Sequence, residues 1–373
     1  MPVLLQSDNT LYLGIGNKII TVNLNNGDSE CHDLPPINLP ENRSKAQEDL
    51  FQEVPIITTI SASKNGTLLV VSTHNRQVVT YNTKNLLPLS NFIITRAASK
   101  ICFDNSNNVI VADKTGDAYL YKQDQEPSLL LGHLSMLLDI QMSPCGKFVI
   151  TSDRDEKIRV SHYPNCYNIL CYCLGHQEFV TNVSIVNDQL LSASGDGSIC
   201  LWDYKTGNKI LHIDSNKLLS DKSVETFKDV MDKDNIEVNA IPLTDMQVHE
   251  YKSGFALIAI TLFQWNNVEV YEFDFKAQTI SHVQKINVKD GATIVAISLG
   301  AQLSILTNDD LIVYNYVESE NKFAVSALGN VIKKYEDITV KYLTKSDVSL
   351  LYKRKFDNVQ DYLDRKKQRL DGK

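Results

Sequence analysis

One pattern occurs twice, head to tail, between residues 131 and 207 of this chain. A Gly-His pair ends at His133 and returns at His176, and an aspartate in a turn-like stretch, Asp155, returns 41 residues later as Asp196. The second copy closes on the sequence Cys-Leu-Trp-Asp, whose tryptophan is Trp202. A period of about 40 to 45 residues between Gly-His and Trp-Asp marks is typical of WD-repeat blades. The repeat therefore predicts an all-β propeller built from small four-stranded antiparallel sheets.

The second copy also predicts a chain of hydrogen bonds that locks its blade. Buried imidazole, hydroxyl, carboxylate and indole groups must find partners. The four candidates are His176, Ser192, Asp196 and Trp202. We interpret them as a structural network that locks the blade, and not His176 and Asp196 as a catalytic pair. The first copy predicts the same arrangement with His133, Thr151 and Asp155, although Ser161 replaces the tryptophan.

The chain length of 373 residues suits one seven-bladed propeller with additions. We expect the propeller to span residues 1–335, with loop insertions at about 25–53 and 214–235, the second holding one helical turn. Tyr81 and Tyr121 fall where Trp202 falls in its repeat, so an aromatic ring fills that position in three blades. We expect an N-terminal strand to complete the last blade, which would close the ring and leave no unpaired strand edge where the first and last blades meet. The expected blades are 3–24, 55–82, 93–122, 131–164, 174–213, 236–275 and 280–317.

Charge is distributed unevenly along the chain. The formal net charge is −8, which argues against a general nucleic-acid-binding protein. Residues 341–373 carry ten basic and five acidic side chains, whereas the rest of the chain has a net charge of −13. We therefore expect residues 336–373 to form a basic C-terminal tail, with a helix from Asn358 to Leu370. Two basic runs, 353–355 and 365–369, also fit a nuclear import signal.

Motifs that would indicate an enzyme, a cofactor or a metal are missing from the sequence. There is no GxSxG elbow, no P-loop, no HExxH and no dinucleotide fingerprint. The seven cysteines include no CxxC pair, so Cys171 and Cys173 with nearby histidines are a weak zinc candidate. The first ten residues, MPVLLQSDNT, have neither a basic nor an apolar signal region. We expect a non-catalytic protein with no cofactor, no bound metal and no membrane segment.

The first repeat carries more charge in its turn than a blade requires. We call residues 153–157 the charged turn; they read Asp-Arg-Asp-Glu-Lys, and Arg159 follows shortly after. Such a run is commonly a solvated surface. The alternative is a docking site whose charges complement those of a partner protein.

Five stretches closely resemble one family of WD-repeat proteins. They are LGHLSMLLDI at 131–140, TSDRDEKIRVSHYP at 151–164 and KRKFDNVQDYL at 353–363, together with LGHQEFV and SGDGSICLW in the second repeat. The family is that of the non-catalytic WD-repeat subunit of tRNA (guanine-N7)-methyltransferase, also called Wuho. The string DRDEKIRVS is much more specific than a generic WD mark.

The resemblance implies a scaffold that binds and stabilises a separate catalytic subunit. That subunit forms N7-methylguanosine in the variable loop of tRNA, in a heterodimer located in the nucleus and also the cytoplasm. A flap endonuclease is a second partner that the resemblance implies. The partner-binding residues that it implies are Asp153, Arg154, Asp155, Glu156, Lys157, Arg159, Lys353, Arg354, Lys355 and Phe356.

Two other functions stay open from the sequence. A generic WD adaptor, such as the substrate receptor of a cullin ubiquitin ligase, often has arginine three residues after the repeat tryptophan, where this chain has Lys205. A stand-alone enzyme would turn over substrate without a partner. A stable complex with a methyltransferase would separate the scaffold from both alternatives.

Overall fold

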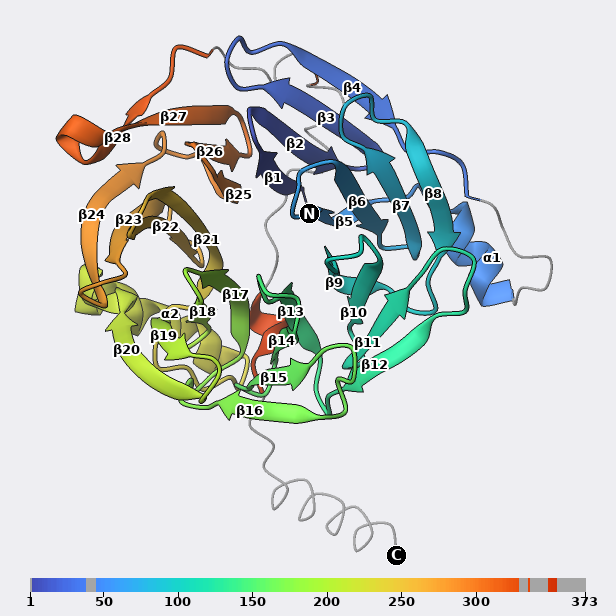
Figure 1. Cartoon of the computed structure of the whole chain (residues 1–373). Coiled ribbons are helices and arrows are strands. Elements are labelled where there is room, and N and C mark those ends of the chain that lie inside the picture. Colours follow the sequence, from blue (N-terminus) through green and yellow to red (C-terminus); the bar gives the residue numbers. More distant parts are fainter. Residues whose placement is uncertain (1, 38–44, 329–334, 336–347, 354–373) are drawn as a thin grey trace, which may run out of the picture.

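The computed structural model describes residues 2–37, 45–328, 335 and 348–353. Across these residues the chain forms seven four-stranded antiparallel sheets that stand around a central channel (Figure 1). The predicted seven-bladed propeller is thus confirmed. In each sheet the four strands follow one another in sequence, and the first strand lies innermost.

The first three blades are formed by the first twelve strands, and the first insertion lies at the end of blade one and before blade two. Blade one holds β1 (Val3–Ser7), β2 (Thr10–Ile15), β3 (Lys18–Asn23) and β4 (Ser29–Asp33). Blade two holds β5 (Ile57–Ala62), β6 (Leu68–Thr73), β7 (Gln77–Asn82) and β8 (Pro88–Ile93). Blade three holds β9 (Ala98–Phe103), β10 (Val109–Asp113), β11 (Asp117–Tyr121) and β12 (Ser128–Gly132).

The two repeats of the sequence form blades four and five. Blade four holds β13 (Leu137–Met142), β14 (Phe148–Asp153), β15 (Ile158–His162) and β16 (Ile169–Cys173). Blade five holds β17 (Val180–Val186), β18 (Gln189–Ser194), β19 (Ser198–Asp203) and β20 (Asn208–Asp214). Blade six holds β21 (Leu243–Lys252), β22 (Phe255–Leu262), β23 (Asn267–Asp274) and β24 (Thr279–Asn287). Blade seven holds β25 (Ile294–Leu299), β26 (Gln302–Thr307), β27 (Leu311–Val317) and β28 (Lys322–Val325).

The core is divided among the seven spaces between neighbouring blades. The second strands of most blades are almost wholly buried, as β6 and β18 show, because each sheet is covered on both faces. Each cluster of buried side chains joins two adjacent blades; Leu191 in blade five, for example, shares its cluster with Ile258 in blade six. Leu306 in blade seven likewise shares its cluster with Leu13 in blade one. Burial of apolar surface between blades, and not within one blade, therefore holds the ring together.

The ring closes differently from the expectation. Blade one and blade seven are each complete from consecutive strands, so among the described residues no N-terminal strand enters the last sheet. The seam is instead a packed interface like the other six, with an added hydrogen bond from the Gln6 amide to the Ser298 hydroxyl at 2.9 Å. The expectation failed because β1 pairs with β2 through five consecutive residues and completes its own sheet.

The two insertions contain more regular structure than the sequence analysis predicted. β4 and the helix α1 (Lys45–Gln52) both fall inside the expected loop 25–53. The second insertion holds α2 (Asp221–Lys233), a 13-residue helix where one helical turn was expected. Ser220 caps it by accepting from the Ser223 amide, and Phe227 and Met231, four residues apart, bury one side. The short 3₁₀ helix η1 (Ser215–Leu218) leads into α2.

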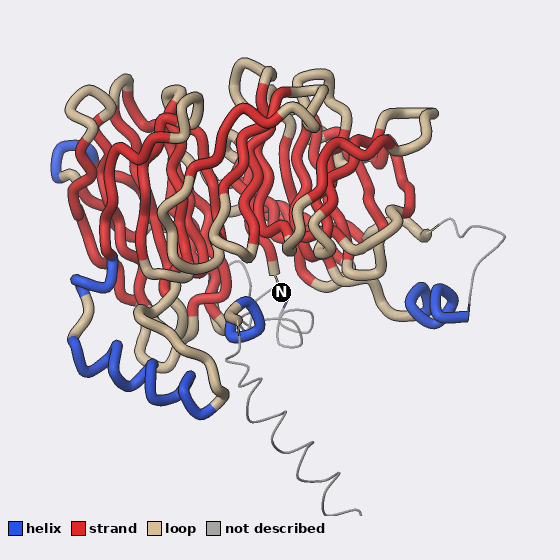
Figure 2. Tube along the Cα trace, turned by 90° about the horizontal axis from the view of Figure 1, so that it is seen from below, coloured by secondary structure: helices blue, strands red, loops and turns tan. Residues whose placement is uncertain are grey.

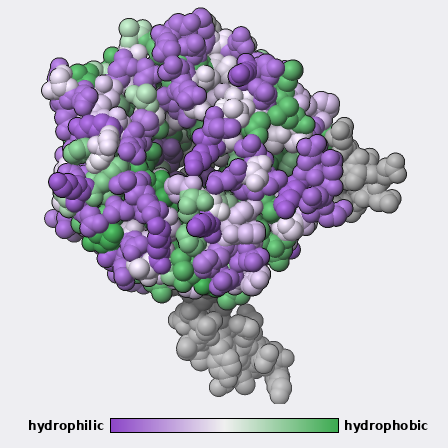
Figure 3. Space-filling model, viewed as in Figure 1, coloured by the Kyte–Doolittle hydropathy of each residue, from purple (hydrophilic) through white to green (hydrophobic). Residues whose placement is uncertain are grey.

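The helices gather on one side of the ring, which we call the helix face (Figure 2). α1, α2 and the 3₁₀ helix η4 (Val348–Leu351) all lie there, whereas η2 (Glu318–Glu320) lies between β27 and β28. The view in Figure 3 shows mostly hydrophilic residues around a central hollow. Among the described residues no helix is long and apolar enough to cross a membrane. The expected tail helix at 358–370 lies outside the described residues.

Candidate partner-binding site

The structure brings the four expected residues of blade five into one chain of hydrogen bonds. The His176 ring lies 3.0 Å from Asp196 Oδ2 through Nδ1 and 2.7 Å from Ser192 Oγ through Nε2. The Trp202 indole donates to the same hydroxyl at 2.8 Å. Burial opposes ionisation of Asp196, but its bond to His176 lowers the pKa of that carboxyl to about 2. This arrangement ties the first turn of the blade to its second and third strands.

In blade four the histidine reaches a different carboxylate from the one expected. His133 Nδ1 lies 2.9 Å from Asp153 Oδ2, and its Nε2 lies 2.9 Å from Thr151 Oγ1. The other oxygen of Asp153 accepts the backbone amides of Asp155 and Lys157 at 2.9 and 3.0 Å. The assignment of Asp155 to the network is therefore wrong. Asp153, two residues earlier at the end of β14, supplies the carboxylate, and its side chain is buried.

The rest of the charged turn faces outward with an unusual backbone. Glu156 has φ of +68°, a left-handed conformation, at the turn position that Gly116 and Gly197 occupy in blades three and five. A side chain in this region costs about 1–2 kcal/mol relative to glycine. Lys157 is exposed, and its ammonium donates to the Asp155 carbonyl at 3.2 Å. Blade two has Arg76 with φ of +71° at the same position, so the turn accepts a side chain there at this cost in two blades.

Arg159 does not lie on the surface as the partner hypothesis expects. Its side chain lies inside blade four, and the whole residue is only 7% exposed. The guanidinium donates to the Gly132 carbonyl at 3.1 Å and to the Cys166 carbonyl at 2.6 Å, and Nε donates to Ser161 Oγ at 2.8 Å. Arg159 therefore ties β15 to the end of β12 in blade three and to Cys166 in the turn before β16, and its donors are used inside the propeller.

A segment near the C-terminus lies against the charged turn. We call residues 348–353 the strap. The ammonium of Lys353 lies 2.8 Å from a Glu156 oxygen and 3.3 Å from an Asp155 oxygen. Arg154 donates in the same direction, to carbonyls of the strap. The other tail residues that the resemblance implies lie outside the described residues: Arg354, Lys355 and Phe356.

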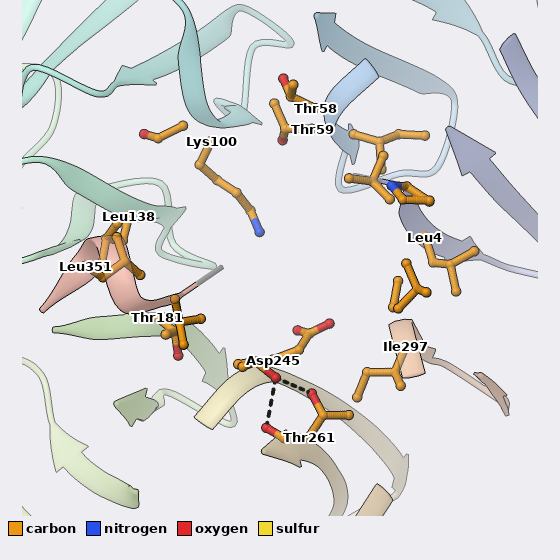
Figure 4. A pocket seen from close by; sticks show the side chains of 18 of the residues that line it. Leu4, Thr58, Thr59, Lys100, Leu138, Thr181, Asp245, Thr261, Ile297 and Leu351 are labelled. Carbon is orange, nitrogen blue, oxygen red and sulfur yellow. Dashed lines mark hydrogen bonds between the residues drawn. The ribbon is translucent and has the colours of Figure 1, made fainter. Parts of the chain in front are cut away.

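A cluster of charged side chains at the centre of the ring, of which Asp139 is buried and Lys100 and Asp245 are half-buried, was not predicted. Lys100 Nζ lies 3.6 Å from Asp139 Oδ1, and the other oxygen of Asp139 accepts the Val183 amide at 3.0 Å. Lys100 and Asp245 point into a pocket of about 520 Å³, with the strap residue Leu351 at its edge (Figure 4). Asp139 raises the pKa of Lys100, whereas burial raises the pKa of both carboxyls. These charges link the inner strands of blades three, four and six.

A positional signal for this cluster exists in the sequence. Asp139 and Asp245 each follow a one-residue shift in pairing on the innermost strand, and Lys100 occupies the same place in its blade. Aligning the weak repeats by this position would have brought the three residues together. The marks Gly-His and Trp-Asp cannot do so, because blades three and six lack them.

Two other candidates from the sequence have local roles. The Lys205 ammonium is bonded to the Asp188 carboxylate of its own blade. The Cys171 thiol donates to the Tyr204 carbonyl at 3.1 Å, and burial raises the pKa of Cys173 to about 12. In the part of the chain that the structure describes, no three His, Cys, Asp or Glu side chains are arranged to hold a metal ion.

Known proteins are similar to this chain over most of the ring, and the similar part includes the charged turn. The family model described as the tRNA methyltransferase TRM82 WD40 domain matches residues 120–319. The non-catalytic subunit wuho of tRNA (guanine-N(7)-)-methyltransferase from Drosophila grimshawi is 33% identical over 298 residues, 75% of this chain and 70% of that protein. Wuho from Culex quinquefasciatus is 29% identical and covers 87% of this chain and 78% of its own length.

A human relative and a solved structure extend the comparison. The human non-catalytic subunit WDR4 of tRNA (guanine-N(7)-)-methyltransferase is 35% identical over 215 residues, 54% of this chain and 52% of that protein. A chain in the crystal structure of the Mitotic Checkpoint Complex superposes with a TM-score of 0.63 at 13% identity. It covers 83% of this chain and 87% of its own length, and it supports the propeller fold alone.

Proposed function

Because this chain belongs to the family of non-catalytic WD40 subunits of tRNA (guanine-N7)-methyltransferase, we propose that it is the scaffold of such an enzyme. It binds and stabilises a separate catalytic subunit that forms N7-methylguanosine in the variable loop of tRNA. The observation that carries this proposal is the family match, which runs through blades four and five and includes the charged turn. The relatives are named as non-catalytic subunits, which agrees with a chain that supplies structure and not chemistry.

The docking surface that we propose is the outer part of the charged turn. Asp155 and Glu156 hold their carboxylates toward solvent, with side chains about a third exposed. The partner group that fits them is basic. Charge complementarity of this kind steers association and suppresses wrong partners. Arg159 contributes by holding blade four in shape, since its guanidinium is bonded to the backbone carbonyls of Gly132 and Cys166.

Co-expression with the catalytic subunit of the same organism tests the scaffold role. We expect a stable one-to-one complex and, with S-adenosylmethionine, N7-methylation of tRNA that the catalytic subunit alone performs at a small fraction of the rate. Absence of a complex, or equal activity without this chain, would contradict the proposal. A cullin adaptor in place of a methyltransferase in the eluate from native cells would favour the adaptor function.

Replacement of Glu156 by glycine tests the docking surface. Glycine adopts the left-handed backbone without strain, so Glu156→Gly should keep the free energy of unfolding or raise it by up to about 1 kcal/mol. Loss of the carboxylate should weaken binding of the catalytic subunit about tenfold, measured by titration at low salt. Arg76→Gly is the matched control, because Arg76 has φ of +71° at the same turn position of blade two. Equal affinities for wild type and Glu156→Gly would show that the interface lies elsewhere.

The basic tail is our proposed contact with tRNA in the complex. Residues 354–373 continue from the strap and carry most of the positive charge of the tail. Phosphate contacts release counterions, so their loss lowers the dependence of affinity on salt concentration. We therefore expect replacement of the basic residues at 365–369 by alanine to reduce the salt dependence of tRNA binding by the complex. The same basic runs are the ground for proposing a nuclear location, which imaging of the variant chain would check; the flap endonuclease partner stays a prediction.

A further inference from the structure

The strap lies on the helix face (Figure 2), beside the inner strands of blades four and five (Figure 1). Val348 and Tyr352 are 4% and 3% exposed and join the apolar cluster that fills the space between blades five and six. Leu351 lies at the edge of the central pocket, so the strap also covers part of the channel mouth (Figure 4). Burial of this degree marks the strap as part of the folded propeller.

Tyr352 is the anchor of the strap. Its hydroxyl donates to the Gly195 carbonyl at 3.2 Å, and its ring meets the edge of Phe179 with centroids 4.9 Å apart. Phe179 lies so close to Gly195 that a side-chain carbon there would come within 2.6 Å of its ring. The site for Tyr352 is therefore built by blade five, from the turn between β18 and β19 and from the segment before β17.

Arg154 joins the strap to the charged turn. Its Nε donates to the Leu351 carbonyl at 3.0 Å and its Nη2 donates to the Tyr352 carbonyl at 3.4 Å. Its own backbone amide donates to the Met136 carbonyl at 2.9 Å. Because the carbonyls at the end of a 3₁₀ turn lack partners within the turn, the guanidinium satisfies them and fixes its own position. The charged turn is thus held by the hydrogen bonds of Asp153 to its backbone amides and by the bonds of Arg154 to the strap.

The remaining link is the ion pair of Lys353, which is weaker. The Lys353 side chain is 56% exposed, and exposed ion pairs contribute little to stability. Removing Lys353 from Glu156 therefore requires little energy, whereas removing Tyr352 from its site would expose a buried ring and the channel mouth. A basic partner group can replace the ammonium of Lys353 while the anchor stays in place.

We infer that the strap orders the charged turn in advance for the catalytic subunit. Tyr352 anchors the strap, and the hydrogen bonds of Arg154 to the strap fix the conformation of Asp155 and Glu156. Tyr352 and Arg154 are therefore positioning residues and do not contact the partner. When a binding loop is ordered before association, the entropy cost of ordering it no longer reduces the binding affinity. This inference rests on the proposed function, because it concerns the same docking surface.

Two substitutions at Tyr352 in the full-length chain test the inference. Tyr352→Ala empties the anchor site and should weaken binding of the catalytic subunit about tenfold. Tyr352→Phe keeps the ring and loses only the bond to Gly195, so its affinity should stay within about threefold of wild type. Leu303→Ala, a fully buried change in blade seven, is the control for general loss of stability and should leave the affinity unchanged. Wild-type affinity in Tyr352→Ala would overturn the inference, and tighter binding would show that the strap competes with the partner.

A second measurement needs no partner. The amides of Asp155 and Lys157 donate to Asp153 in the ordered turn, so their hydrogen exchange reports its order. We expect exchange at these two amides to be faster in Tyr352→Ala and unchanged in Tyr352→Phe and Leu303→Ala. Unchanged exchange in Tyr352→Ala would overturn the inference. If no complex forms even with the wild-type chain, the proposed function fails, whereas this exchange result still decides whether the strap orders the turn.

Discussion

Four ionisable side chains from three segments interact where the strap meets the charged turn. Lys353 pairs with Asp155 and Glu156, and Glu178 joins them from the segment before β17. Burial, and then repulsion from Glu156, raises the pKa of Glu178 to about 7, while Lys353 acts in the opposite direction. The folded state therefore binds a proton that the unfolded chain has released above its usual pKa of 4.5. Stability from this group is present below about pH 4.5 and is lost as the pH rises to 7.

Replacing Glu178 by glutamine should remove this pH dependence. Between pH 4.5 and 8 we expect the wild type to lose about 1–2 kcal/mol of unfolding free energy through Glu178, after allowance for solvent screening. Glu178→Gln should show a flatter profile and be the more stable protein at pH 8, as measured by urea unfolding at both pH values. Glu30→Gln, at an exposed carboxyl on β4, should keep the wild-type slope. Parallel profiles for wild type and Glu178→Gln would contradict this account.

The sequence could identify the residue types of the site but not which of them meet. Asp155 and Asp196 do occupy equivalent turn positions, so the repeat spacing was correct, yet the His133 ring bonds to Asp153. Two carboxylates two residues apart satisfy the same motif, and only side-chain geometry separates them. Arg159 was expected at the interface because the resemblance implied it, but its burial depends on acceptors from three places: Ser161 on its own strand, Gly132 at the end of β12 and Cys166 before β16.

At the scale of the element, one aromatic position serves two blades differently. Trp202 in β19 and Tyr81 in β7 occupy the same place in their blades, and both are buried. The indole of Trp202 donates to Ser192, whereas the Tyr81 hydroxyl has no hydrogen-bond partner among the described residues. The aromatic ring fills the blade edge in both cases, but only one of the two polar groups is part of a network.

Removing each polar group separates packing from hydrogen bonding. Trp202→Phe should cost about 2–4 kcal/mol, because it shrinks a buried ring and takes a donor from the Ser192 hydroxyl. Tyr81→Phe keeps the ring and removes a buried hydroxyl without a partner, so it should be neutral or stabilise by about 1 kcal/mol. Urea unfolding of both variants against wild type measures the contrast. A loss of more than 1 kcal/mol in Tyr81→Phe would reveal a partner for that hydroxyl, such as a bound water.

Elements were predictable where apolar residues alternate or run together. The inner strands follow this rule, and seven blades could be counted from them. The outer strands could not, since β4 reads Ser-Glu-Cys-His-Asp and has one exposed edge with little apolar pattern. For α2 the signal was present, because Phe227 and Met231 are spaced for one face of a helix, but the polar composition of the segment outweighed it. For the strap the sequence offered only Leu350 and Leu351 as apolar residues in a basic segment, because six residues gain their structure only from the blades that they contact.

At the scale of the whole molecule, the ring is held by seven interfaces of one kind. In the described chain no strand is shared between the first and last blades, so the seam depends on side-chain packing between blades seven and one. Each blade contributes to two interfaces, and the interface between blades five and six is also covered by α2 and the strap. Local opening should therefore begin at whichever interface is weakest, and the two blades beside it should lose protection together.

Cavities made at two interfaces test this view of the ring. Leu306→Ala empties the seam between blades seven and one, and Leu191→Ala empties the interface between blades five and six; both side chains are fully buried. Each should cost about 2–5 kcal/mol of unfolding free energy. Native-state hydrogen exchange should show faster opening of β1–β4 and β25–β28 in Leu306→Ala, and of β17–β24 in Leu191→Ala. Because a propeller closed by a shared strand would couple its first and last blades through backbone hydrogen bonds, faster exchange spread evenly over all blades in Leu306→Ala would contradict closure without a shared strand.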